Sequence, residues 1–279
     1  MRWVSEVSAE IDRLVVATHD RAGALYPGHA LAGVLTAHPG VVNALGLALM
    51  RGPVAVESLK VIHPYLPARL IDLLVENNVA EGVVQLEAGE LVLTQLGYET
   101  ARLANELLDE AAGFSWCDAG ALSPVETVSD ALIAHACTLD PPAQPSAFAV
   151  TCTMTDRPTQ AGRLFRLLSA LRYWRADAHR AAWAVAGLTV QEAHALNQLW
   201  DLDRGIDRVG QGDPRPGRTG VTALSEKGYA AGDTITEAGR QARASIEADT
   251  DDRTEPVYAP LDDAARTTLL AGLRQLRIN

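Results

Sequence analysis

Residues 160–188 read QAGRLFRLLSALRYWRADAHRAAWAVAGL, and this stretch decides the fold. It contains no proline, and Gly187 stands near its end, where a helix would stop. The stretch therefore predicts a single helix of about seven turns at 3.6 residues per turn. Steps of about 100° per residue gather apolar side chains on one face, which we expect to be buried. These side chains are Leu164, Leu167, Leu171, Trp174, Ala178, Ala182 and Val185.

A second stripe along the edge of that face holds the side chains that could bind a ligand or react with it. Arg175, His179 and Trp183 follow one another at intervals of four residues. A polar side chain at such a partly buried border needs a partner or a ligand. The stripe offers a cation, a titratable imidazole and an aromatic wall, a set that suits an anionic or enol-bearing organic ligand. The alternative is that Arg175 and His179 form structural hydrogen bonds between helices.

Composition and charge restrict the class of protein. The chain has 279 residues, enough for two domains, and 35 acidic residues against 24 basic ones give a net charge of −11. This charge repels phosphates overall but does not exclude a local basic patch. Neither the three cysteines nor the seven histidines have metal-ligand spacing, so we expect no metal, no disulfide and no cofactor. Without a signal peptide or a run of ~20 apolar residues, the chain is expected to be cytoplasmic and to have no membrane contact.

A pattern of proline, glycine and threonine residues occurs twice along the chain. Residues 67–69 (Pro-Ala-Arg) correspond to residues 216–218 (Pro-Gly-Arg), and Thr94-Gln-Leu-Gly97 corresponds to Thr236-Glu-Ala-Gly239. Asp109 corresponds to Asp251 at the same spacing as the threonines. We therefore predict a tandem duplication: a first repeat over residues 1–140, a proline-rich linker over 141–158 and a second repeat over 159–279.

Each repeat reads as helices followed by a short ribbon of two strands. In the first, residues 83–94 form two apolar runs joined at Ala88-Gly89, and a long helix follows from about Tyr98. In the second, residues 232–235 are a shortened ribbon before a helix that starts at Thr236. The predicted fold is mainly α with short β-hairpin wings: a duplicated winged helix-turn-helix that forms a pseudo-dimer.

This order of elements resembles the winged-helix proteins of the MarR type. The second half is also similar to a largely uncharacterised actinobacterial winged-helix family, through Arg175-Ala-Asp177-Ala-His179, Ala186-Gly187-Leu188 and residues 235–239. Ile206 departs from that family, which tends to carry tryptophan at this place. MarR-type proteins are usually homodimers of one winged helix. The resemblance therefore implies a fused pair, acting as a monomer or as a homodimer.

The resemblance implies DNA binding, but the residues argue against it. The DNA contacts would be Arg69 in the first recognition helix and Arg215, Arg218 and Lys227 around the second. The first wing, residues 79–95, holds three glutamates and no basic residue. Without wing contacts to phosphates, most of the counterion-release contribution to affinity is lost. DNA is therefore an improbable partner.

The favoured function is a repurposed winged-helix scaffold that binds a small, largely apolar organic molecule between its repeats. As a cofactor-independent biosynthetic enzyme of specialised metabolism, it would perform a cyclisation, dehydration or isomerisation, with His179 transferring a proton and Arg175 stabilising an anion. Two alternatives remain: a ligand-responsive MarR-type regulator, and a resistance protein that sequesters a metabolite. Further residues expected at the ligand are Trp174, Asp177 and Trp183 from the second repeat and Tyr26 and His29 from the first.

Overall fold

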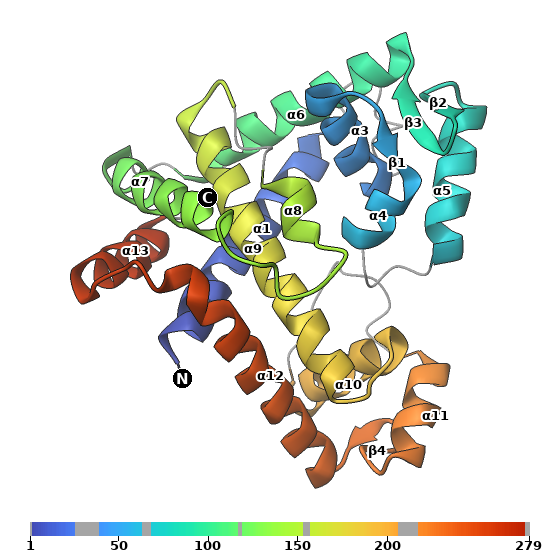
Figure 1. The fold of residues 1–279 in the computed structure, drawn as a ribbon, viewed down its shortest axis with the longest axis vertical. Coiled ribbons are helices and arrows are strands. Elements are labelled where there is room, and N and C mark those ends of the chain that lie inside the picture. The colour runs from blue at the N-terminus through green and yellow to red at the C-terminus, as the bar shows by residue number, and fades with distance from the viewer. Residues whose placement is uncertain are drawn as a thin grey trace.

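The computed structural model describes residues 2–25, 39–62, 68–116, 119–152, 157–205 and 217–276. These ranges hold twelve helices and two small antiparallel sheets, so the molecule is mainly helical with hairpins consistent with wings (Figure 1). In these ranges, no helix is both long and apolar enough to cross a membrane.

The first part of the chain consists of helices and a hairpin. Its elements are α1 (Trp3–Leu25), α3 (Pro39–Arg51), β1 (Val54–Ala55), α4 (Val56–Ile62), α5 (Ala68–Ala80), β2 (Val84–Glu87), β3 (Glu90–Leu93), α6 (Gln95–Ser115), α7 (Ala119–Ala136) and α8 (Ala147–Thr151). We call α3–α6 the first unit.

The second part is shorter and also consists of helices with a hairpin. Its elements are α9 (Gln160–Val185), α10 (Val190–Asp203), α11 (Arg218–Glu226), β4 (Ala230–Ala231), β5 (Thr234–Ile235), α12 (Glu237–Tyr258) and α13 (Asp263–Gln275). We call α10–α12 the second unit. The two units lie at opposite ends of one side of the molecule, while α7 and α13 lie together on the other side (Figure 1).

The predicted hairpin of the first unit is confirmed. Val84 pairs with Leu93, and Ala88 and Gly89 form the turn with φ values of 50° and 85°. A two-residue turn with positive φ at both positions has a backbone twist that matches the twist of the two strands it joins. Residues 54–55 add a third strand, which pairs with β3.

The start of the long helix is built identically in both units. Thr94 caps α6 by accepting from the Gly97 amide at 3.1 Å, and its hydroxyl donates to the Gly82 carbonyl at 2.6 Å. Thr236 caps α12 by accepting from the Gly239 amide at 3.0 Å, and it donates to the Gly228 carbonyl at 2.6 Å. These contacts fix the angle between each hairpin and the helix that follows.

The main core joins the two parts of the chain. Side chains from α1, α6, α7, α9, α12 and α13 form one cluster, which includes Val7, Trp116, Phe165 and Leu273. The predicted apolar face of α9 is buried, with 2% exposure or less at six of its seven residues. The exception is Val185, which is 75% exposed because it ends the helix beyond the core.

The proline-rich segment predicted as a linker contains structure of its own. Helix α8 lies within residues 141–158, and Ser146, Ala147 and Phe148 are buried. The Phe148 ring meets Trp174 edge to face, with 5.0 Å between ring centroids. Helix α8 is therefore packed on α9.

Candidate functional site

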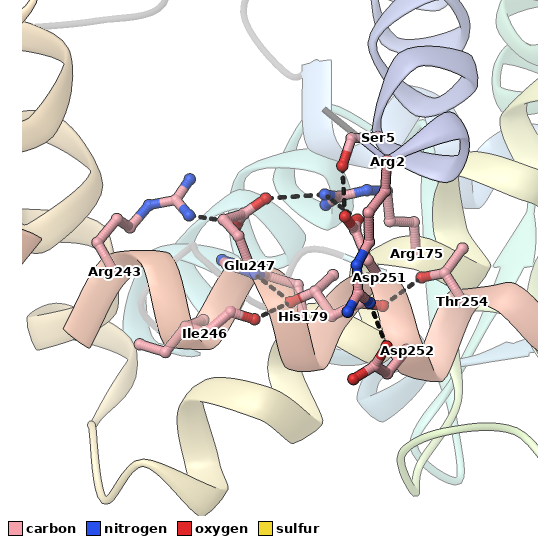
Figure 2. Close-up of polar contacts among 11 residues, drawn as sticks. Arg2, Ser5, Arg175, His179, Arg243, Ile246, Glu247, Asp251, Asp252 and Thr254 are labelled. Atoms are coloured by element: carbon pink, nitrogen blue, oxygen red, sulfur yellow. Dashed lines mark hydrogen bonds and ion pairs between the residues drawn. The ribbon is translucent and has the colours of Figure 1, made fainter. Parts of the chain in front are cut away.

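The candidate site lies where α12 packs along α9 (Figure 2). Arg175 and His179 come from α9 and are one turn apart. Arg243, Glu247 and Thr250 come from α12, where intervals of three and four residues put them on one face. The site is therefore built between two long helices of the second part of the chain.

His179 is a buried, neutral imidazole. Its Nδ1 lies 3.1 Å from the Thr250 hydroxyl oxygen and 3.4 Å from a Glu247 carboxylate oxygen. The Thr250 hydroxyl donates its only hydrogen to the Ile246 carbonyl at 2.7 Å, so it can only accept from His179. The proton therefore sits on Nδ1, and Nε2 keeps its lone pair. Burial lowers the pKa of His179 to about 4, so the ring is uncharged at neutral pH.

Glu247 holds the two arginines of the site. Its carboxylate lies 2.8 Å from Arg175 Nη2 and 2.5 Å from Arg243 Nη1, and Arg175 also reaches Asp251 at 3.4 Å. Burial alone would raise the pKa of Glu247, but Arg243 and Arg175 outweigh it and hold the pKa below its ordinary value. Two guanidinium groups face two carboxylates, and the site is balanced in charge.

The amino-terminal end of α1 is tied to the same helix. The Ser5 hydroxyl donates to Asp251, and Arg2 pairs with Asp252 (Figure 2). Asp251 is buried and receives both Ser5 and Arg175, so it connects α1, α9 and α12. The first part of the chain thereby contributes to one edge of the site.

Three buried donors at the site lack acceptors. Arg175 Nε, Arg243 Nε and Trp183 Nε1 have no hydrogen-bond partner among the described residues. A buried polar group left unpaired costs about 1–3 kcal/mol, so native structures rarely leave one without a partner. All three belong to residues of α9 and α12.

Two predicted ligand residues make hydrogen bonds within the chain. The Asp177 carboxylate accepts from the Ser146 hydroxyl at 2.7 Å and from the Ala147 and Phe148 amides at 3.0 Å each, so it caps α8. The Trp174 indole donates to the Arg253 carbonyl at 3.4 Å. Tyr26 and His29 lie outside the described residues, so the approach of His29 to His179 stays a prediction.

Sequence reasoning missed the half of the site that α12 provides. Its residues form the stripe of Arg243, Glu247, Thr250 and Asp251. The spacing was visible in the sequence, but charged residues on a helix are typical of a solvated face. Only the position of α9 shows that this stripe is turned inward.

The predicted DNA-contacting residues differ in their surroundings. Arg69 and Arg218 are exposed near the starts of α5 and α11. Lys227 instead donates to the Gly187 carbonyl at 2.7 Å and pairs with Glu192 at 2.8 Å, so it holds α11 against α10 and the end of α9. Arg215 lies outside the described residues.

A model of a helix-turn-helix family matches residues 83–278, from the first hairpin through α13. No curated protein and no solved structure matches the chain.

Proposed function

Because the chain belongs to this helix-turn-helix family, we propose that it is a tandem pair of winged-helix units whose α9–α12 junction binds a small organic molecule. The observation that carries the binding proposal is the set of three buried, unpartnered donors of α9 and α12. The tandem arrangement and the chemistry of the ligand are supported separately.

Equivalent contacts support the duplication. Helix α7 packs on α9 as α13 packs on α1, and the pairs α1–α9 and α7–α13 contact each other across the core. Asp109 on α6 and Asp251 on α12 are both buried. Asp109 binds Arg157, just before α9, and Asp251 binds Ser5, near the start of α1. With the two identical threonine caps, these pairs are what a pseudo-two-fold axis would produce.

The balance of charge indicates which ligand suits the site. Since Glu247 and Asp251 compensate Arg175 and Arg243, an added anion would be left without a counter-charge. A largely apolar molecule with carbonyl or hydroxyl oxygens would accept from the three donors without adding charge. This differs from the preference for acidic ligands that the sequence suggested for Arg175.

His179 would give such a site acid–base chemistry. Its Nε2 lone pair is a weak base, because burial lowers the pKa of His179 to about 4, and it can accept a proton only from a correspondingly acidic group of a ligand, while the Nδ1 proton is held toward Thr250 and Glu247. An enzyme of the cyclase, dehydratase or isomerase type would use this proton transfer. A protein that only sequesters a metabolite would use the donors alone.

A thermal-shift screen tests the binding proposal. The screen uses neutral, oxygenated polycyclic ketones and their carboxylate analogues, and a ligand at ~100 times its Kd stabilises the chain by ~2.7 kcal/mol. Trp183→Phe keeps the ring and deletes the N–H group, so it should reduce the shift. The control Trp200→Phe, in the same apolar cluster, should preserve it. If no compound shifts the melting temperature, or if both variants respond equally, the proposal fails.

Turnover distinguishes an enzyme from a binding protein. For any ketone that binds, His179→Gln should abolish conversion while leaving the thermal shift in place. Conversion that survives in His179→Gln would remove His179 from the chemistry.

A MarR-type regulator is the second candidate, favoured by the family match and by the second unit. Helix α11 begins at Arg218 and exposes Thr219, Thr222 and Ser225, short polar side chains that can contact DNA. The leading proposal expects binding to duplex DNA weaker than the usual non-specific ~10⁻⁴ to 10⁻⁶ M at physiological salt. Salt-sensitive binding in a polarisation assay, lost in Arg218→Ala but kept in Arg69→Ala, would favour the regulator.

A further inference from the structure

Exposed apolar side chains are concentrated on the first unit. Of the seven large apolar residues that stand out as exposed in the described ranges, five belong to α5, its wing and the start of α6. These five are Leu70, Leu73, Val79, Leu86 and Tyr98, with exposures between 39% and 50%. Leu70 and Leu73 share one face of α5, and exposed apolar side chains gathered in this way are typical of an interaction site.

The outward face of α5 combines these leucines with acids. The helix buries Ile71, Val75 and Asn78. On the opposite side, Leu70, Leu73 and Asn77 lie within about 60° of one another around the axis. Glu76 lies about 60° from Leu73, and Asp72 lies about 100° from it. In a helix-turn-helix protein this face of the second helix would enter the major groove. Here it offers apolar and acidic groups.

The charge of this surface excludes two occupants. Residues 68–94 contain one arginine against five acidic residues, and the nearby Lys60 is already paired with Glu57 at 2.7 Å and Asp72 at 3.2 Å. Phosphates would be repelled. A second copy of the chain would bring the same acids and a net charge of −11.

We propose that α5 and the β2–β3 wing form a docking surface for a partner protein that presents leucine-like side chains flanked by lysine or arginine. Leu70 and Leu73 supply the apolar contact, and Leu86 is likewise exposed on the wing. The exposed Glu76, Glu87 and Glu90 provide the complementary charge, whereas Asp72 is already paired with Lys60. This surface is separate from the α9–α12 junction, and the proposal does not depend on a ligand there.

Fluorescence polarisation with the full chain tests the surface. The probe is a fluorescein-labelled amphipathic helix of leucine and lysine, and a peptide with glutamate in place of lysine is its control. Only the lysine peptide should bind, and added salt should weaken it. Leu70→Ser combined with Leu73→Ser should weaken binding at least tenfold. Val185→Ser combined with Leu202→Ser, which alters similarly exposed side chains elsewhere, should change it less than twofold.

Other outcomes would overturn the proposal. Equal losses in the two serine pairs would show that the peptide binds without regard to place, and unchanged affinity in Glu76→Lys combined with Glu87→Lys would remove the role of charge. Duplex DNA binding lost in the Leu70/Leu73 variant would assign the surface to nucleic acid. A dimer in sedimentation velocity that dissociates in the same variant would assign it to a second copy.

Discussion

The hydroxyl of Thr250 decides the chemistry of His179. Because this hydroxyl donates to the Ile246 carbonyl, it leaves the imidazole one option, to donate from Nδ1. The ring is thus oriented by a neighbour that is itself fixed by helix α12. Such a chain of hydrogen bonds makes the protonation of His179 sensitive to folding, and this can be measured.

Stability should fall in mild acid because of His179. Its pKa in the folded protein is about 4, below the ordinary 6.5. Above pH ~6.5 the ring is neutral whether folded or unfolded. As the pH falls from ~6.5 toward ~4, the unfolded chain gains a proton that the folded chain does not, so the free energy of unfolding decreases. Between pH ~7.5 and pH ~5 the loss is about 2 kcal/mol.

Urea unfolding at the two pH values checks this. His179→Gln should lack that part of the pH dependence, whereas the control His135→Gln should keep it. Equal pH dependence in the wild type and His179→Gln would show that the imidazole does not carry it.

Asp177 is expected to be structural. Asp177→Ala would leave the Ser146 hydroxyl and two amides of α8 without their acceptor, which should lower the free energy of unfolding by about 3 kcal/mol in urea unfolding. The control Asp130→Ala breaks an exposed pair with Arg163 and should cost at most about 1 kcal/mol. A loss in Asp177→Ala no larger than in the control would contradict the capping role.

At the scale of elements, the hairpin–helix joints are the most constrained positions. A Cβ atom at Gly97 would lie 2.0 Å from the Val83 carbonyl oxygen, and one at Gly239 would lie 2.2 Å from that of Tyr229. Each of these oxygens also accepts a hydrogen bond from the backbone amide of the capping threonine. Neither oxygen can therefore move away without breaking the hydrogen bond that joins hairpin and helix. Both units therefore require glycine for the same reason.

Alanine substitutions test this equivalence. Gly97→Ala and Gly239→Ala should each lower the free energy of unfolding by about 2 kcal/mol or more in urea unfolding. Gly113→Ala, also in α6 but with nothing near its Cβ, should stabilise by up to about 1 kcal/mol. A harmless substitution at either joint would show that the two starts are not built alike.

The sequence predicts some elements better than others. The face of α9 and the hairpin follow from patterns within one segment, namely a 3.6-residue period and the Ala88-Gly89 turn. Strand β1 is two residues long and exists because β3 lies beside it. Helix α8 depends on a carboxylate about thirty residues away, at Asp177. Elements that depend on distant partners leave little local signal.

The candidate site shows the same division. Arg175, His179 and Trp183 were found because one helical period connects them. Glu247 and Thr250 were not, since their role depends on how α12 packs against α9. The site could therefore be predicted from one of its two helices only.

At the scale of the whole molecule, the shared core makes the two parts interdependent. Helices from both parts contribute to one apolar cluster, so separating them would expose it. Fragments 1–156 and 157–279, expressed alone, should not form stable monomers, and mixing them should restore one cooperative unfolding transition. Circular dichroism and sedimentation velocity check this. A monomeric fragment that unfolds cooperatively alone would show that the parts are independent domains.

The two units also differ on their outer faces, and this gives the molecule a direction. A symmetric dimer presents the same surface twice and therefore suits a palindromic target. In this chain α5 offers leucines and acids, whereas α11 offers an arginine and short hydroxyl side chains. A complex that forms through these faces is therefore asymmetric, because its two ends carry different side chains. A titration should then saturate at one partner per chain, bound in a single orientation.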